Sequence, residues 1–159
     1  MLDPLRYSAD KEDEDQKEKD SEREAEDSFA KKLLKTRTIL LSDEISKKLA
    51  HKVIAQLLLL EQDDEDEPIK MFIDSPGGDA DAGFAIHDMI RFIKPKVKCI
   101  CAGLTASAAV IVLLGSGKKD RLSLPNARLL LHQPQTAFMG HAADIRIEAY
   151  EIVKIRDRI

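Results

Sequence analysis

Hydrophobic and polar residues are arranged along this chain in the order expected of strands that alternate with helices. Short apolar runs bounded by polar residues predict three strands, at residues 38–41, 69–73 and 97–102. Apolar positions recur at helical spacing over residues 44–61 and 79–93, and we expect Ser42 to cap the first of these two helices. This alternation predicts an α/β fold with a mostly parallel sheet.

The pattern continues toward the C-terminus. Residues 107–114 are almost wholly apolar, so a helix there should be buried centrally and not lie on the surface. Two more short strands are expected at residues 121–124 and 127–131. A last helix is expected from about Ala143 to Ile159, with an apolar stripe between charged positions.

The N-terminal part of the chain has a different composition. Residues 9–27 hold eleven acidic and four basic residues, a local net charge of −7 in a chain of 159 residues whose net charge is −4. A segment with almost no apolar residue cannot form a core. We therefore expect residues 1–28 to be an acidic, disordered tail and residues 29–159 to form one folded domain.

Several classes of protein are disfavoured by composition. No run approaches the roughly 20 apolar residues of a membrane span, no secretory signal pattern opens the chain, and no basic stripe suggests nucleic-acid binding. Cys99 and Cys101 are two residues apart in a predicted strand, so both side chains are expected on the same face. No further cluster of metal ligands lies nearby in the sequence, which favours buried thiols over a metal site. We expect a cytoplasmic protein with no metal, no cofactor, and neither nucleic acid nor membrane as partner.

The candidate chemistry lies in one serine, one histidine and one glycine turn. Ser107 follows a predicted strand and opens the apolar helix, where the helix N-terminus favours negative charge and the N–H of Ala108 is left unpaired. His132 follows the last predicted strand, and the turn Gly77-Gly78 can present backbone N–H groups. A nucleophile, a base and an oxyanion site are the parts of a serine hydrolase.

Each of these signals has an ordinary structural alternative. A serine before a helix is commonly an N-cap, and a histidine at the end of an apolar strand is commonly a packed or hydrogen-bonded residue. A Ser-Pro-Gly-Gly sequence needs no catalytic reason to form a tight turn. It is their combination and order that favour a hydrolase.

In that order the motifs closely resemble the proteolytic subunits of the Clp protease family. The resemblance runs from Phe29 to Ile159. It rests on DSPGG at residues 74–78, FIKP at 92–95, TAS at 105–107, LPNAR at 124–128, HQP at 132–134 and ADIRIEA at 143–149.

The resemblance implies an ATP-dependent serine endopeptidase in which Ser107 is the nucleophile and His132 the general base and acid, with the N–H groups of Gly78 and Ala108 forming the oxyanion hole. It implies a crotonase-like fold of repeated β-β-α units with a long terminal handle helix. Family members stack two seven-membered rings of identical or paralogous subunits around a closed chamber. Hydrophobic patches on the outer face receive a hexameric AAA+ unfoldase that delivers unfolded polypeptide, and ATP binds that partner.

The sequence also departs from the family. The aspartate that completes the family's triad lies in a region beyond Ile159, and neither Asp144, Glu151 nor Asp157 matches its position. The chain ends within a predicted helix, which indicates a C-terminal truncation, and the pair after the serine is Ala108-Ala109 where the family usually has Met-Gly. These departures leave a second hypothesis open, an impaired or structural paralogue in a mixed ring. A third, an acyl-CoA enzyme on the same fold, is disfavoured by the Ser107/His132 pair.

Overall fold

The structure is a computed structural model in which residues 28–159 are described. The chain divides into two compact units, Met1–Thr36 and Arg37–Ile159. Residues 28–34 of the first unit are helical, and the acidic segment predicted to be a disordered tail lies outside the described residues. Among the helices of the described part, none is both long enough and apolar enough to cross a membrane.

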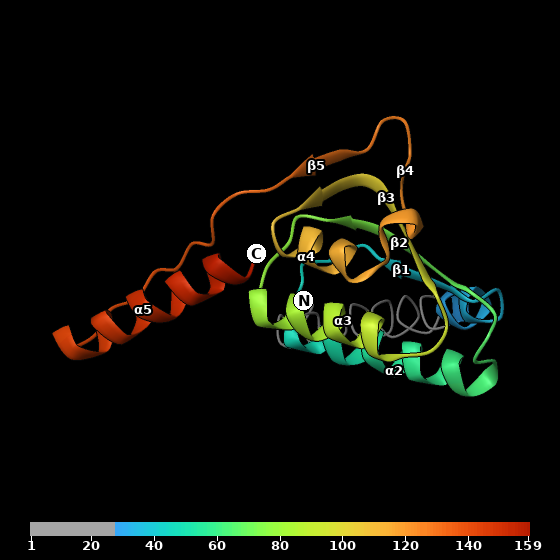
Figure 1. The fold of residues 1–159 in the computed structure, drawn as a ribbon, viewed down its shortest axis with the longest axis horizontal. Helices are drawn as coiled ribbons and strands as arrows, with labels where there is room; N and C mark the ends of the chain where they lie inside the picture. Colours follow the sequence, from blue (N-terminus) through green and yellow to red (C-terminus); the bar gives the residue numbers. More distant parts are fainter. Residues whose placement is uncertain (1–27) are drawn as a thin grey trace, which may run out of the picture. The chain divides into compact units, whose positions relative to one another are not determined.

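A parallel sheet of five strands is the centre of the second unit (Figure 1). Its strands are β1 (Thr38–Leu41), β2 (Ile69–Ser75), β3 (Val97–Ala106), β4 (Arg121–Ser123) and β5 (Arg128–Leu130). Their order is β1-β2-β3-β4, and β5 also pairs with β3. β4 pairs with the first half of β3 and β5 with its second half, and every pairing is parallel. The α/β fold with a parallel sheet is therefore confirmed.

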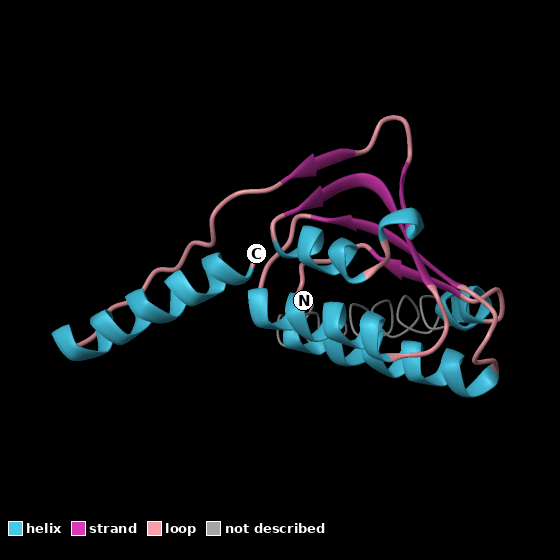
Figure 2. Cartoon of the chain, in the orientation of Figure 1, coloured by secondary structure: helices cyan, strands magenta, loops and turns pink. Residues whose placement is uncertain are grey.

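Helices cover one side of this sheet (Figure 2). They are α2 (Lys47–Asp63), α3 (Ala80–Phe92) and α4 (Ala108–Gly115), while a short 3-10 turn, η1 (Lys118–Asp120), leads into β4. Alternate strand residues point at the helices, so Ile69, Met71 and Ile73 of β2 have no exposed surface. In α4, Ala109 and Val112 are completely buried, as its all-round apolar sequence predicts.

The last helix, α5 (Ala142–Arg158), extends from the body of the unit over most of its length (Figure 1). It has no buried residue of its own. Its C-terminal end returns to the body, where the Arg158 guanidinium lies 3.8 Å from the centre of the Phe84 ring on α3. A cation over an aromatic face is an attractive contact, and it joins the end of α5 to the helical layer.

Two predicted boundaries were wrong. The cap of α2 is Ser46 and not Ser42: the Ser46 hydroxyl accepts a hydrogen bond from the N–H of Leu49. The preceding residues stay extended because Ile45 forms a β-bridge with Gly78. β3 runs four residues beyond the predicted end at Ala102, through a bulge that a simple alternation pattern does not reveal.

Arg37 connects the start of β1 to the end of α2. Its guanidinium donates four hydrogen bonds of 2.8–3.2 Å to the backbone carbonyls of Leu60, Asp64 and Glu67. Leu60 lies in the last turn of α2, Asp64 is its C-cap and Glu67 lies in the loop that follows, so one guanidinium fork ties the end of the helix to that loop. Arg121 does the same at the end of α4.

Replacing Arg37 with alanine should lower the free energy of unfolding by about 2 kcal/mol, because the carbonyls of Leu60, Asp64 and Glu67 lose their charged donor. Urea unfolding followed by circular dichroism measures the change. Lys48→Ala, which removes an exposed cation from α2, should change the midpoint little. Equal midpoints for the Arg37 variant and the wild type would contradict this assignment.

Candidate functional site

Ser107 stands at the junction of β3 and α4 in a strained backbone conformation. Its φ of 52° and ψ of −121° are unusual for a residue with a side chain. Ser107 is the N-cap residue of α4, but its side chain makes no capping hydrogen bond, so capping does not account for the serine. Its N–H donates instead to the carbonyl of Leu130 at the end of β5, at 2.8 Å. A sharp strand-to-helix turn of this kind projects a serine hydroxyl away from the backbone.

The glycine turn packs directly against this serine. A Cβ on Gly77 would lie 2.7 Å from the Cβ of Ser107 and 2.6 Å from the carbonyl oxygen of Ala106, and its φ is +93°. Only a residue without a side chain fits here. This close contact between Gly77 and Ser107 places the glycine turn beside the N–H of Ala108, the first residue of α4.

The extended segment that precedes α2 holds the glycine turn from the side opposite Ser107. The N–H of Ile45 donates to the carbonyl of Gly77 at 2.7 Å, and the N–H of Asp79 donates to the carbonyl of Ile45 at 2.8 Å. The buried Ser75 hydroxyl donates to the carbonyl of Asp43 at 2.6 Å. The turn is therefore fixed between β3 and the segment that precedes α2.

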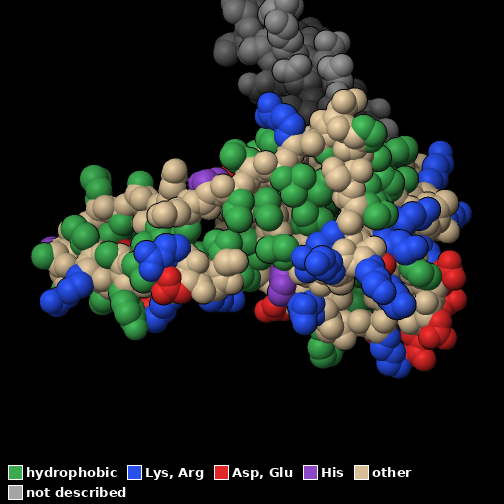
Figure 3. Space-filling view, turned by 45° about the horizontal axis from the view of Figure 1, so that its top comes forward, with side chains coloured by type: hydrophobic (Ala, Val, Ile, Leu, Met, Phe, Trp, Pro, Cys, Tyr) green, Lys and Arg blue, Asp and Glu red, His purple; other side chains and the backbone are tan. Residues whose placement is uncertain are grey.

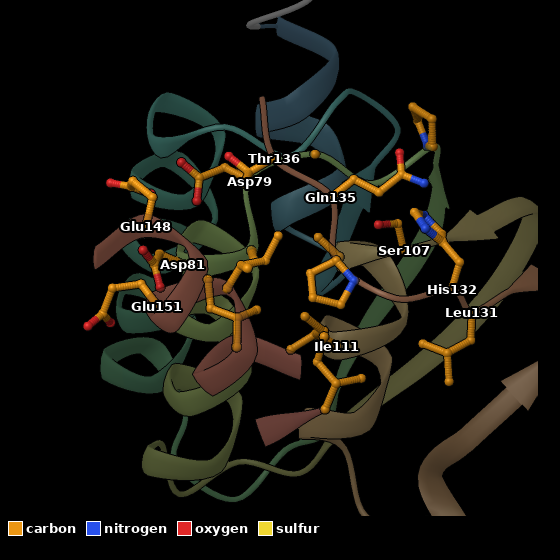
Figure 4. A pocket seen from close by; sticks show the side chains of 18 residues that line it. Asp79, Asp81, Ser107, Ile111, Leu131, His132, Gln135, Thr136, Glu148 and Glu151 are labelled. Atoms are coloured by element: carbon orange, nitrogen blue, oxygen red, sulfur yellow. The ribbon is translucent and has the colours of Figure 1, made fainter. Parts of the chain in front are cut away.

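One cavity of about 480 Å³ brings the predicted site residues together. Ser107, His132, Gly78 and Ala108 all line it, and Figure 4 shows the Ser107 and His132 side chains near one another. In the described part of the chain, neither the N–H of Gly78 nor that of Ala108 donates a hydrogen bond to another protein group. Two free amides, a serine and a histidine therefore share one pocket.

His132 lies two residues beyond β5 and is exposed. No hydrogen bond or ion pair of its ring is found among residues 28–159, so the alternative of a packed core histidine is wrong. The pocket's carboxylates include Glu148 and Glu151, which lie across the pocket from His132 in Figure 4. None of the described carboxylates therefore takes the orienting role of a triad acid.

The sequence did not reveal that α5 would line the pocket. Ile152 and Ile155 project into the same cavity as Ile111 of α4, and Asp79 and Asp81 add charge at the start of α3. The apolar stripe of α5 was visible as a periodic pattern, but the surface it faces depends on where the helix returns to the body. That return is marked by the contact of Arg158 with Phe84, which has no local sequence signature.

The two cysteines are buried, as predicted, with exposed fractions of 0% and 1%. They lie on the helix-facing side of β3, in register with Met71 and Ile73 of β2. Burial raises the pKa of the Cys99 thiol to about 11, and the hydrogen bond with Ser116 opposes that rise. A thiol held protonated at neutral pH is a poor nucleophile. Within the described residues, no group of three or more His, Cys, Asp or Glu could hold a metal ion.

Comparison with known proteins decides the family. A family model described as Clp protease matches residues 20–159, which is most of the chain. The chain belongs to the Clp protease family. This is a family of serine peptidases.

Curated Clp protease relatives agree with this family. The ATP-dependent Clp protease proteolytic subunit 2 of Treponema denticola is 49% identical over 92% of this chain and 73% of its own length. The subunit of the same name from Treponema pallidum is 51% identical over 82% of this chain and 66% of its own, so the chain spans just under two thirds of that relative. A mutant of ClpP1 from Listeria monocytogenes has a similar structure, with a TM-score of 0.72 and 48% identity over 82% of this chain and 71% of its own.

These Clp protease relatives are named as proteolytic subunits, so the function they support is that of a serine peptidase in an ATP-dependent Clp protease. The alternative of an impaired or structural paralogue gains no support from them. The acyl-CoA alternative rested on the fold alone, and the family assignment replaces it.

Gly77→Ala should reduce the hydrolysis of a fluorogenic peptide by about 100-fold or more, because the new methyl group displaces Ser107 from its position. The matched control is Gly117→Ala: its Cβ would meet only the Asp120 carboxylate, at 3.3 Å, and its φ is an ordinary −61°. Equal rates for the two variants would show that the contact between the turn and Ser107 is unimportant.

Proposed function

We propose that this chain hydrolyses peptide bonds with Ser107 as the nucleophile and His132 as the general base and acid. The observation that carries the proposal is the strained backbone of Ser107 at the N-terminus of α4, in a cavity that His132 also lines. A strained residue at a pocket points to a functional constraint. The family supports the reaction class, and the geometry of the pocket supports the choice of these two residues.

In the first step, the Ser107 Oγ attacks the scissile carbonyl carbon while His132 takes the hydroxyl proton. The negative charge that develops on the carbonyl oxygen is stabilised by the N–H groups of Gly78 and Ala108 and by the N-terminal end of the α4 dipole. The C–N bond then breaks as His132 returns the proton to the leaving amine. Water, activated by the same histidine, hydrolyses the acyl-enzyme and restores the serine.

The lining of the pocket supports a peptide as substrate. Ile152 and Ile155 of α5 form an apolar wall, and the carboxylates of Asp79, Asp81 and Glu148 line the same cavity. Apolar and charged groups together can contact both the side chains and the polar backbone of a peptide, which are accessible once a protein has been unfolded. This fits a peptidase that receives its substrate from a separate unfoldase.

The open side of the sheet supports docking of that unfoldase. On the face away from the helices, one apolar side chain from each of four neighbouring strands stands in register: Leu40, Phe72, Ile100 and Leu122. Leu40 and Leu122 are 48% and 49% exposed. Phe72 between them is half-buried and Ile100 is 8% exposed. An apolar row with exposed ends is typical of a binding surface, and we assign it to the AAA+ partner.

The exposed side of α5 supports assembly with identical or paralogous subunits in stacked seven-membered rings. Hydrophobic side chains follow this helix on its outside (Figure 3). They are Ile145, Ile147, Tyr150 and Val153, with exposed fractions of 39–63%. A helix that leaves such residues uncovered is stabilised when a second subunit packs against it.

Ser107→Ala should abolish both the fluorophosphonate adduct and peptide hydrolysis, because the attacking oxygen is lost. Intact-mass spectrometry of the labelled chain and a fluorogenic peptide assay measure the two effects. His132→Ala should lower the hydrolysis rate by at least about 10³-fold. Ser123→Ala, which removes an exposed hydroxyl bonded only to a backbone carbonyl, is the control. An adduct that persists without Ser107 would refute the assignment.

Phe72→Ser should reduce degradation of a folded protein in the presence of a Clp-type AAA+ unfoldase and ATP, because the apolar row loses its second member. Hydrolysis of a short peptide, which needs no unfoldase, should stay within about twofold of wild type, since this side chain is on the face opposite the pocket. Leu59→Ser, at an exposed position of α2, serves as the control. Equal losses in both assays would mean that the row supports the fold and not docking.

A further inference from the structure

β2 and β3 change register just before the site. Ile73 pairs with Cys101, but Ser75 pairs with Thr105. β3 therefore advances four residues where β2 advances two. The extra residues form a bulge that contains Gly103, whose φ is +65°.

The Asp74 side chain holds this bulge. Its Oδ1 accepts a hydrogen bond of 2.8 Å from the N–H of Leu104. A Cβ on Gly103 would lie 2.5 Å from the same oxygen, so the carboxylate occupies the inside of the bend. A backbone amide that the regular ladder would have paired with β2 is thus paired with a side chain instead.

The bulge decides which residue of β3 meets the glycine turn. Beyond it the ladder resumes at Ser75 and Thr105, and two residues further on Gly77 packs against Ser107. Without the two extra residues, Thr105 would stand opposite Gly77. The register shift is therefore what brings the serine to the turn.

We propose that Asp74 is a positioning residue for Ser107, and this rests on the proposed function of that serine. The carboxylate does not touch the substrate; it fixes the bulge that sets the position of the nucleophile. What the bulge requires is an acceptor oxygen at the distance of Oδ1 from the backbone. A negative charge is not required.

Two conservative variants separate these requirements. Asp74→Asn keeps an acceptor at the same distance and removes the charge, whereas Asp74→Glu keeps the charge and moves the acceptor outward by one methylene. The position is exposed, so both variants should fold. The rate of fluorophosphonate labelling of Ser107 should stay within about threefold of wild type for Asn and fall about 10- to 100-fold for Glu.

In peptide hydrolysis, kcat should likewise be near the wild-type value for the Asn variant and lower for the Glu variant. KM should change by less than about twofold, because the Glu variant displaces the nucleophile and not the surface that binds the substrate. Exchange of the Leu104 amide with deuterium should be faster in the Glu variant than in the Asn variant, because its acceptor is displaced. Asp66→Ala, which also removes an exposed carboxylate, should leave all three measurements unchanged.

The reverse order, with Glu fast and Asn slow, would show that charge matters and would overturn the proposal. Labelling of both variants at the wild-type rate would overturn it as well. A wild-type chain that forms no adduct at Ser107 is a different result: it refutes the proposed function, while the deuterium exchange still reports whether Asp74 holds the bulge.

Discussion

The contact between Gly77 and Ser107 is the constraint on which the site depends. The two residues belong to successive strand-to-helix connections, and they approach so closely that no side chain fits at the glycine. This approach places the turn beside the first amide of α4, where a developing negative charge is best stabilised. The neighbouring elements act together to maintain it.

Three groups of interactions hold that contact. On one side, Ile45 bonds to the backbone on both sides of Gly78 and fixes the turn. On the other, the N–H of Ser107 is held by the carbonyl of Leu130, which also brings the end of β5, and hence His132, toward the pocket. Between them, the bulge in β3 sets the register. If any one of these interactions were removed, Ser107, His132 and the glycine turn would still be present in the chain but would no longer be held together.

Much of this could be predicted from the sequence, and the errors have physical causes. The strands and helices were predicted because apolar residues repeat with a period of two or 3.6, a local property. The cap at Ser42 was wrong because a β-bridge to Gly78 keeps Ile45 extended, and a distant residue overrides local cap preference. β3 was predicted too short because its bulge is held by the side chain of Asp74, from another strand. The approach of α5 to the pocket was missed for the same reason.

The sequence by itself determined which groups the protein can use: a serine before an apolar helix, a histidine after a strand, a glycine pair, and motifs in the order of the Clp protease family. Those are properties of residue type and local order. Only the tertiary structure decided that Ser107 is strained and makes no capping hydrogen bond, that His132 is exposed without a partner among the described residues, and that α5 lines the cavity. Each of these depends on contacts between residues far apart in the chain, and local residue order does not encode their geometry.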